Sequence, residues 1–316
     1  MQTSPLITFI VAAYRIPDAL LTACLRSIFA VRLDLGTKEI IVVDDGNEED
    51  IAASWPAEWK EQIVLLRQPN QGAAAARNAA LDWAQGEYIQ IVDADDFLFP
   101  QLYSSLLLFT VLHKLDVMAF RSTSRETVAD DGLQLECGLI DGASYMLHHN
   151  VRAASWGYIF RRATLGDLRF DPRLRHEEDE LFTPQLLLRA KVVYSSLATP
   201  YFYRQRKGSL TNADHATFIN RHLPNFEYIL PLLQHLDLPD REREAMDRRV
   251  AQLTMDYLFN VVRHTRSASA LNDRIAWLRD CSLYPLPNRR YTWKYVVFRR
   301  LMAWRLTRRL LVLLIR

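Results

Sequence analysis

The chain contains little cysteine and no long apolar run. Its 316 residues include three widely separated cysteines, Cys24, Cys137 and Cys281, and no CxxC pair. The sequence therefore predicts neither a zinc site nor a disulfide framework. No stretch of about 20 uninterrupted apolar residues occurs, which argues against a transmembrane helix. The short apolar segment 6–13 lacks a basic leader, so we expect a strand there rather than a secretory signal.

Excess charge of one sign is also lacking. Lysine and arginine number 39 against 37 acidic residues, and the net charge of +2 is too small to indicate a nucleic-acid partner. Hydrophobic residues make up 49% and charged residues 24%, as in ordinary folded proteins. The length fits one large domain or two smaller ones. The unpaired cysteines fit a reducing compartment, so we expect a cytoplasmic protein.

The first hundred residues alternate between strand-like and helix-like segments. Strands are predicted at 7–13, 39–43, 63–67 and 87–92, and helices at 18–30 and 73–85. Continuously apolar strands in such an alternation indicate a parallel sheet that is covered on both faces. Ligands of these sheets bind outside the carboxyl ends of the strands, where Tyr14, Asp44-Asp45 and Asp93–Asp96 are predicted to lie.

The rest of the chain divides near 210–216. Before that boundary we predict helices at 100–114 and 181–189, with extended segments at 116–121, 192–194 and 200–204. After it, long helical stretches rich in arginine and leucine follow. We therefore expect an α/β domain at 1–210, with halves 1–97 and 98–210, and a helical region at 211–316.

Three carboxylates stand within four residues at the end of the fourth predicted strand, in the string Asp93-Ala94-Asp95-Asp96. Like charges at this spacing repel, and a divalent cation is the usual compensation. Mg²⁺ is commonly shared between one or two carboxylates and the phosphates of a substrate. An acidic turn that caps the next helix is the structural alternative, because aspartate is also a good N-cap.

Four further strings can carry chemistry, and each also has a structural interpretation. Asp44-Asp45-Gly46 is either a nucleoside-binding acid or a turn. The small-residue segment 70–78, which ends in Arg77-Asn78, is either an anion site or a packed alanine helix. The acidic run 177–180 either contains a general base or forms a solvated face. The cationic segment 203–209 either binds phosphate or is a basic loop.

Taken in order, these strings resemble family 2 of the inverting glycosyltransferases, which have the GT-A fold. The resemblance covers about residues 5–210. It implies an α/β architecture with a Rossmann-like, mostly parallel central sheet flanked by helices, followed here by a C-terminal helical region. The matching strings are Val11–Tyr14, Val43–Asn47, Asn70–Asn78, Asp93–Asp96, Glu178-Asp179 and Tyr203–Ser209.

The resemblance assigns most of the expected site to nucleotide and metal binding. Tyr14 is expected to stack on the base and Asp45 to bind its edge. Asp93 is expected to hold the ribose or a metal-bound water, and Asp95 to ligate Mn²⁺ or Mg²⁺. Arg204, Arg206 and Ser209 are expected to close over the diphosphate. The other residues assigned to the nucleotide site are Ala12, Arg77 and Ala94.

The same resemblance implies a catalytic pair and an acceptor wall. Asp179 is expected to be the catalytic base, with Glu178 beside it, and Trp156 to lie in the acceptor wall. One carboxylate that deprotonates the acceptor hydroxyl suffices for inversion by single displacement. This sequence departs from the family pattern in having no proline near Ala12, and in carrying Arg15 and Asn47 where asparagine and serine are usual.

The expected function is transfer of a sugar from a nucleotide-diphosphate donor, expected to be a UDP-sugar. The expected acceptor is a hydroxyl of a glycan or lipid-linked molecule in surface polysaccharide synthesis. A non-catalytic nucleotide-sugar-binding protein of the same fold remains an alternative. A sugar nucleotidyltransferase is the other, although Ala12–Arg15 stands where such enzymes usually carry a glycine-rich phosphate loop.

The last 28 residues, 289–316, are basic and aromatic, and no acid follows Asp280. If this segment forms one helix, Lys294, Arg305, Arg309 and Arg316 share a face. A cationic face beside aromatic and leucine residues is typical of a helix in an anionic membrane interface. We therefore expect peripheral attachment to the inner face of the cell membrane. Packing on the catalytic domain or on a second subunit is the alternative.

Overall fold

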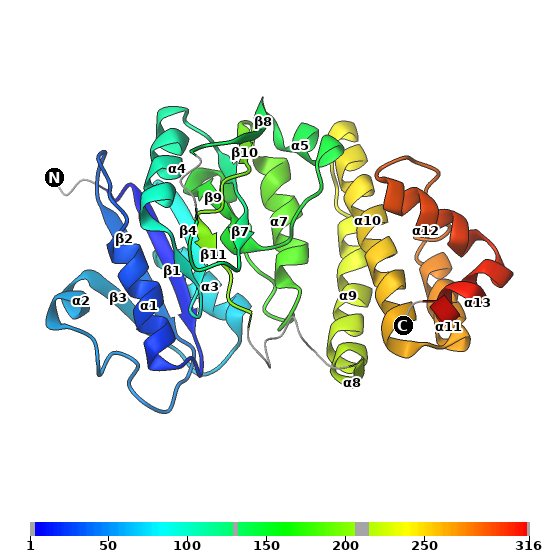
Figure 1. The fold of residues 1–316 in the computed structure, drawn as a ribbon, viewed down its shortest axis with the longest axis horizontal. Coiled ribbons are helices and arrows are strands. Elements are labelled where there is room, and N and C mark those ends of the chain that lie inside the picture. Colours follow the sequence, from blue (N-terminus) through cyan, green and yellow to red (C-terminus); the bar gives the residue numbers. More distant parts are fainter. Residues whose placement is uncertain (1–3, 129–131, 206–214, 315–316) are drawn as a thin grey trace. The chain divides into compact units, whose positions relative to one another are not determined.

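A computed structural model describes residues 4–128, 132–205 and 215–314. The chain forms two compact units (Figure 1). The first comprises Met1–Tyr145 and Arg152–Gln205, and the second comprises Met146–Val151 and Arg206–Arg316.

The first unit is built on a sheet whose strand order is β3-β2-β1-β4-β9-β6-β10-β8. Strands β3, β2, β1 and β4 are parallel neighbours, and β10 is parallel to β6. Strand β9 is antiparallel to β4 and β6, and β8 is antiparallel to β10. The predicted α/β, mostly parallel architecture is confirmed. The strands are β1 Ile7–Ala13, β2 Lys38–Asp44, β3 Ile63–Arg67, β4 Tyr88–Asp93, β6 Val117–Ala119, β8 Leu135–Ile140, β9 Tyr158–Arg161 and β10 Val193–Ser196.

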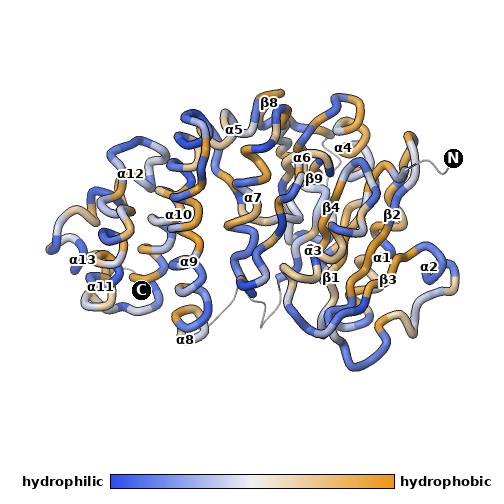
Figure 2. Tube along the Cα trace, turned by 180° about the vertical axis from the view of Figure 1, so that it is seen from behind, coloured by the Kyte–Doolittle hydropathy of each residue, from blue (hydrophilic) through white to orange (hydrophobic). Residues whose placement is uncertain are grey.

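Helices cover both faces of this sheet, because the side chains of a buried strand alternate between faces. Odd-numbered residues of β1, such as Phe9 and Val11, share one core with Leu25 and Leu106, which belong to α1 and α4. Helix α3 contacts β1 and β2, and its buried Ala76 and Ala80 allow close approach. The apolar runs of the central strands stand out in Figure 2. The helices are α1 Asp18–Phe29, α2 Ala57–Gln62, α3 Ala73–Trp83, α4 Pro100–Leu112, α5 Gly142–His148, α6 Arg162–Leu165 and α7 Glu178–Arg189.

A second, three-stranded sheet brings an aromatic segment beside the acidic turn after β4. Its strands are β5 Phe97–Leu98, β7 Ser122–Thr123 and β11 Tyr201–Phe202. Strand β11 is antiparallel to β5 and parallel to β7. The rings of Phe97 and Phe202 stack with centroids 4.3 Å apart. This sheet therefore fixes residues 201–204 against residues 93–98.

The second unit is helical. Its elements are α8 His215–Thr217, the π-helical turn η3 Phe218–His222, α9 Leu223–Gln234, α10 Asp240–Thr265, α11 Ala268–Asp280, α12 Trp293–Ala303 and α13 Arg305–Leu314. Helix α10 contacts α9, α11, α12 and α13. The side chains of Ser267 and Thr292 cap α11 and α12 by accepting from backbone N–H groups in the first turn. Within the described residues, every helix is too short or too polar to cross a bilayer.

The predicted single basic helix at the C-terminus is wrong. Trp304 has extended backbone angles, φ −113° and ψ 142°, and separates α12 from α13. Lys294 and Arg305 therefore lie on different helices and do not share one helical face. Arg305 and Arg309 do share a face of α13. Arg316 lies outside the described residues.

Candidate active site

The carboxyl ends of the three central strands meet at one edge of the sheet. Ala13 of β1 is in register with Asp44, the last residue of β2. Ala12 is in register with Asp93, the last residue of β4. The two acidic strings therefore flank the end of the first strand from both sides, as the alternation of strands and helices predicted.

The turn after β2 links Arg15 and Asn47, two of the positions at which the chain departs from the family pattern. The Arg15 backbone N–H donates to Asn47 Oδ1 at 2.7 Å. The Asn47 amide nitrogen donates to the carbonyl of Ala13 at 2.9 Å and to Asp44 Oδ1 at 2.6 Å. A serine side chain is too short to span these contacts together. Asn47 therefore ties the ends of β1 and β2, and Arg15 takes part in the same contact.

Asp45 is buried and organises the loop that precedes α3. Its carboxylate accepts from the backbone N–H groups of Gln71 and Gly72, both at 2.9 Å. It also accepts from the side-chain amides of Gln68 at 2.7 Å and Asn70 at 3.1 Å. These four contacts fix the loop from which Arg77 is presented. The expected contact of Asp45 with a nucleotide base remains a prediction.

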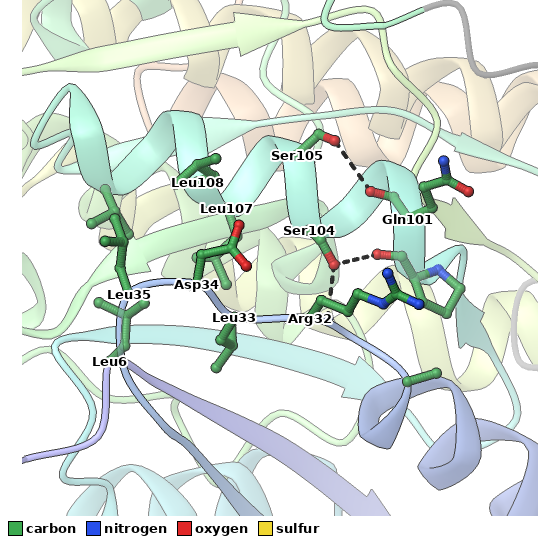
Figure 3. Close-up of a pocket in the computed structure, with 13 residues that line it drawn as sticks. Leu6, Arg32, Leu33, Asp34, Leu35, Gln101, Ser104, Ser105, Leu107 and Leu108 are labelled. Carbon is green, nitrogen blue, oxygen red and sulfur yellow. Dashed lines mark hydrogen bonds between the residues drawn. The ribbon is translucent and has the colours of Figure 1, made fainter.

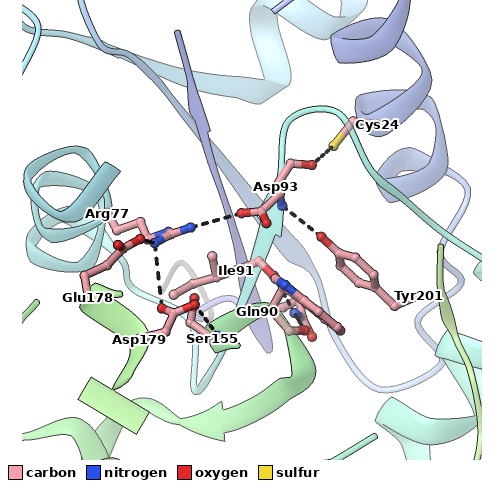
Figure 4. A network of polar contacts seen from close by, with 10 residues as sticks. Cys24, Arg77, Gln90, Ile91, Asp93, Ser155, Glu178, Asp179 and Tyr201 are labelled. Carbon is pink, nitrogen blue, oxygen red and sulfur yellow. Dashed lines mark hydrogen bonds and ion pairs between the residues drawn. The ribbon is translucent and has the colours of Figure 1, made fainter. Parts of the chain in front are cut away.

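Arg77 connects three acidic side chains from distant parts of the chain (Figure 4). Its Nη2 donates to Asp93 Oδ1 at 3.0 Å, and its Nη1 forms an ion pair with Glu178. Asp179 Oδ1 lies 3.8 Å from the same Nη1. The side chain of Arg77 is only 8% exposed, so these contacts are weakly screened by solvent. The guanidinium joins the strand-end acid to the acidic pair at the start of α7.

The electrostatics of this cluster follow from burial and from an excess of carboxylates. Burial alone would lower the pKa of Arg77, but Asp179, Glu178 and Asp93 outweigh it and hold that pKa above its ordinary value. Burial raises the pKa of Asp93 and of Asp179, and Arg77 offsets only part of that rise. One guanidinium faces three carboxyl groups, so the cluster favours a further positive charge or a bound proton.

Asp179 lies between Arg77 and the segment that carries Trp156. The backbone N–H of Ser155, in the short helix η1 Ser155–Gly157, donates to Asp179 Oδ2 at 3.0 Å. Among the described residues no hydrogen-bond donor reaches Asp179 Oδ1. The Trp156 ring stacks on Tyr201 and Tyr203, with centroids 4.6 and 5.6 Å apart. The short helix η1 therefore contacts the predicted base, Asp179, through Ser155 and also carries the predicted acceptor-wall residue, Trp156.

The Asp93–Asp96 turn is held by hydrogen bonds with Tyr201, Cys24 and Arg204. The Asp93 N–H donates to the Tyr201 hydroxyl at 3.0 Å, and the buried Cys24 thiol donates to the Asp93 carbonyl at 3.7 Å. The Arg204 backbone N–H donates to Asp96 Oδ1 at 2.7 Å. Burial, with Asp93 nearby, raises the pKa of Asp96 to about 8. The surroundings therefore oppose a full negative charge on this carboxyl more strongly than water does.

Arg204 closes over this turn from the second sheet. Its Nε donates to the carbonyl of Asp95 at 2.9 Å, and its guanidinium lies 5.0 Å from the ring centroid of Phe202. The predicted partners Arg206 and Ser209 lie outside the described residues. Tyr14 is 39% exposed at the end of β1, and its ring faces the Arg15 guanidinium at 5.2 Å.

The donor set at the end of β4 fits Mn²⁺ or Mg²⁺ that is shared with a substrate. The described residues contain no group of three or more His, Cys, Asp or Glu side chains able to hold an ion. Mg²⁺ usually takes one or two carboxylates and completes its shell with water and substrate phosphates. The partly exposed Asp93 and Asp95 offer hard oxygen ligands of that number. Ala94 between them is buried, and the Asp96 N–H closes the turn by donating to the Asp93 carbonyl at 3.0 Å.

Two cavities of the first unit lie away from this cluster. One, of about 560 Å³, is formed by the loop after α1 and by α4, and includes Arg32, Leu35 and Ser104 (Figure 3). Its lining contains none of the predicted site residues. The other, of about 540 Å³, is lined by Arg15 and Asn47 and therefore borders the turn after β2.

Several residues that shape the site were not predicted from the sequence. Tyr201, Cys24 and Ser155 act through contacts with residues more than 20 positions away, which local spacing does not reveal. Tyr201 carried some signal, because it begins the aromatic run Tyr201–Tyr203. The ion pair of Arg77 with Glu178 joins two strings that had been singled out separately.

The chain is similar in sequence to known glycosyltransferases. Residues 8–156 match the model of the family described as glycosyl transferase family 2. An uncharacterised glycosyltransferase, EpsJ of Bacillus subtilis, is 28% identical over 69% of this chain and 67% of its own. The succinoglycan biosynthesis protein ExoO of Rhizobium meliloti is 26% identical over 83% of this chain and 73% of its own.

Solved structures share the fold at low sequence identity. S. aureus TarS 1–349 in complex with UDP-GlcNAc has a TM-score of 0.65 at 19% identity, covering 96% of this chain and 88% of that one. The mannosyltransferase PcManGT of Pyrobaculum calidifontis, in complex with GDP-Man and Mn²⁺, has a TM-score of 0.60 at 15% identity, covering 99% and 88%. The family match over residues 8–156, the related glycosyltransferase sequences and the GT-A-like fold together support a family 2 glycosyltransferase.

Proposed function

We propose that this glycosyltransferase is an inverting enzyme that transfers a sugar from a UDP-sugar to a hydroxyl of a glycan or lipid-linked acceptor. The observation that carries the proposal is the position of Arg77. It joins Asp93, on the nucleotide side, to Asp179, the proposed base. The acid proposed to act near the leaving nucleotide, Asp93, and the acid proposed to act on the acceptor hydroxyl, Asp179, therefore lie beside one guanidinium.

Asp179 is proposed to take the proton of the acceptor hydroxyl. Ser155 N–H holds one carboxylate oxygen, and the other accepts no hydrogen bond from the described residues. A raised pKa makes this carboxylate a stronger base than an ordinary aspartate. General-base assistance of this kind typically contributes about 10² to 10⁴ in rate. Glu178 is proposed to hold Arg77 in place.

Asp95 and Asp93 are proposed to hold Mn²⁺ or Mg²⁺, which would stabilise negative charge on the departing nucleoside diphosphate. Arg204 packs over the same turn, and with Arg206 and Ser209 it is proposed to face the diphosphate. Tyr14 and Asp45 are proposed to bind the base, and Ala12, Arg77 and Ala94 to complete the nucleotide site. Support for the donor class comes from the UDP-GlcNAc complex of TarS and the GDP-Man and Mn²⁺ complex of the mannosyltransferase.

The proposed role is the synthesis of a surface polysaccharide or teichoic acid. ExoO is named for succinoglycan biosynthesis, and GgaB of Bacillus subtilis for minor teichoic acid biosynthesis. Trp156 is proposed to form the acceptor wall, because it follows Ser155, whose backbone N–H donates to the proposed catalytic base Asp179. We propose that residues 1–210 form the catalytic domain and that the helical region 211–316 attaches the protein to the inner face of the membrane.

A donor screen tests this proposal. Purified protein is incubated with UDP-, GDP- and dTDP-sugars, with Mn²⁺ and an acceptor panel, and the released nucleotide is identified. Release of UDP with a product of inverted anomeric configuration is the expected result. Release of pyrophosphate would favour a nucleotidyltransferase. Thermal stabilisation by a nucleotide sugar without any release would favour a binding protein.

A further inference from the structure

Exposed apolar side chains are frequent in the last two helices of the second unit, α12 and α13, and at Trp304 between them. Of the 15 large hydrophobic side chains that are exposed among the described residues, six lie between positions 293 and 313. Between 47% and 73% of each residue is exposed, so about half or more of each lies outside the packed interior. The six are Trp293, Val297, Trp304, Leu306, Leu310 and Leu313, and they are called the C-terminal apolar set below.

Helix α13 has two distinct sides. Arg308 and Leu311 are buried, and Arg308 donates to Asn272 Oδ1 of α11 at 3.2 Å. This side of α13 packs within the unit, where the helix contacts α10, α11 and α12. Leu306, Leu310 and Leu313 lie on the other side at helical spacing and are 71%, 49% and 71% exposed.

Cations border these leucines. Arg305 and Arg309 are exposed and, at about 100° per residue, form the strip of α13 next to Leu313 and Leu306. On α12 the exposed Trp293 and Val297 are four residues apart, with Lys294 exposed beside them. Figure 1 shows α12 and α13 as neighbouring orange and red helices.

The charged side chains of α12 and α13 are all cationic. No aspartate or glutamate follows Asp280 in the sequence, so acidic side chains from α12 and α13 cannot balance Lys294, Arg305 and Arg309. A two-fold contact between two copies of the chain would set this cationic surface against a second cationic surface. An anionic partner with an apolar layer beneath its charges fits both features.

We propose that this surface, the C-terminal apolar set with Lys294, Arg305 and Arg309, binds the interface of an anionic lipid bilayer. The leucines and tryptophans enter the boundary between headgroups and acyl chains, and the arginines reach the lipid phosphates. The surface is made by two short helices, not by the single long helix expected from the sequence. The inference deepens the proposed membrane location and does not depend on the transfer chemistry.

Vesicle flotation of the full chain tests the inference. The vesicles are phosphatidylcholine alone or mixed with phosphatidylglycerol, at low and high salt. Arg305→Gln/Arg309→Gln is expected to weaken binding to the anionic vesicles by about 30-fold, from roughly fivefold per charge near the surface. Leu306→Gln/Leu310→Gln is expected to weaken it at least as much, because apolar burial is lost.

Matched controls change exposed residues elsewhere. Arg26→Gln/Arg263→Gln removes two exposed cations from α1 and α10, and Leu112→Gln removes a leucine that is 63% exposed at the end of α4. Both controls are expected to float as the unchanged chain does. UDP release in detergent, without vesicles, is expected to be equal in all variants, so failure of the membrane inference is separable from failure of the proposed transfer.

Three outcomes would overturn the inference. The first is full-chain protein that ignores anionic vesicles at low salt. The second is flotation of the arginine and leucine variants at the level of their controls. The third is a dimer of the unchanged chain, seen by sedimentation velocity, that dissociates in the leucine variant while neither protein binds vesicles. That result would assign the surface to contact with a second copy of the chain.

Discussion

Replacing Arg77 with methionine should destabilise the first unit far more than a surface change would. The side chain is 8% exposed and contacts Asp93, Glu178 and Asp179. Methionine fills much of the same volume but leaves these three acidic groups without their common cation. Removal of one partner from a buried ion pair typically costs about 3–5 kcal/mol.

The loss should depend on pH in a direction fixed by the acids. Burial already raises the pKa of Asp93 and Asp179 in the folded protein, and loss of Arg77 raises both further. Because the folded state then binds protons more tightly than the unfolded chain, stability falls as pH rises through these pKa values. The variant should therefore recover part of its stability at pH 5 relative to pH 8.

Thermal unfolding followed by circular dichroism measures the effect. For a domain of this size, about 3–5 kcal/mol corresponds to a decrease in Tm of about 6–20 °C. Glu178→Gln in the Arg77→Met background should restore part of the loss, since one uncompensated charge is removed. A decrease of less than about 2 °C at pH 8, or an equal decrease at both pH values, would show that Arg77 does not hold the cluster together.

The remaining predictions concern the base, one glycine and the metal. Because burial raises the pKa of Asp179, the loss of kcat/KM on acidification should occur at a pH above 3.8, the ordinary pKa of aspartate. Glu178→Gln should move this loss to lower pH, because it removes a negative charge that raises the pKa of Asp179. A loss that occurs at the same pH in the variant would exclude the Glu178 charge as a contributor. Gly46→Ala should lower Tm and weaken UDP binding, because φ at Gly46 is +84° and a Cβ there would lie 2.5 Å from the backbone nitrogen of Asn70. Gly138 has open space around it, so Gly138→Ala should change neither Tm nor UDP binding. Equal effects of the two substitutions would contradict this prediction. EDTA should abolish transfer and Mn²⁺ restore it, and Asp95→Asn should raise the Mn²⁺ concentration needed; EDTA-resistant transfer would refute a metal role.

The sequence predicted the first unit well because its signals are local. Apolar runs and helical spacing locate β1, β3 and α3, and the parallel arrangement then places Asp44 and Asp93 at one edge. Glu178, Asp179 and Arg204 also lie near that edge, in contact with Arg77 or with the turn after β4. Each of these features depends on residues close together in the chain, or on a rule that relates neighbouring strands.

The features that escaped prediction depend on distant contacts or on single backbone angles. Strand β9 enters the sheet antiparallel between β4 and β6, although it follows both in sequence. Trp156 stacks on Tyr201, a pairing across 45 positions that periodicity does not encode. The break at Trp304 interrupts a segment whose residues all tolerate helix, so the helical spacing from Lys294 to Arg305 was misleading.

The central claim is that Asp179 acts on the acceptor and not on the donor. Calorimetric titration of UDP with Mn²⁺ into the unchanged protein and into Asp179→Asn, with transfer measured on the same samples, tests it directly. The account predicts binding within about twofold and transfer reduced by about 10² to 10⁴. Equal loss of binding and transfer, or transfer that persists in Asp179→Asn, would contradict it.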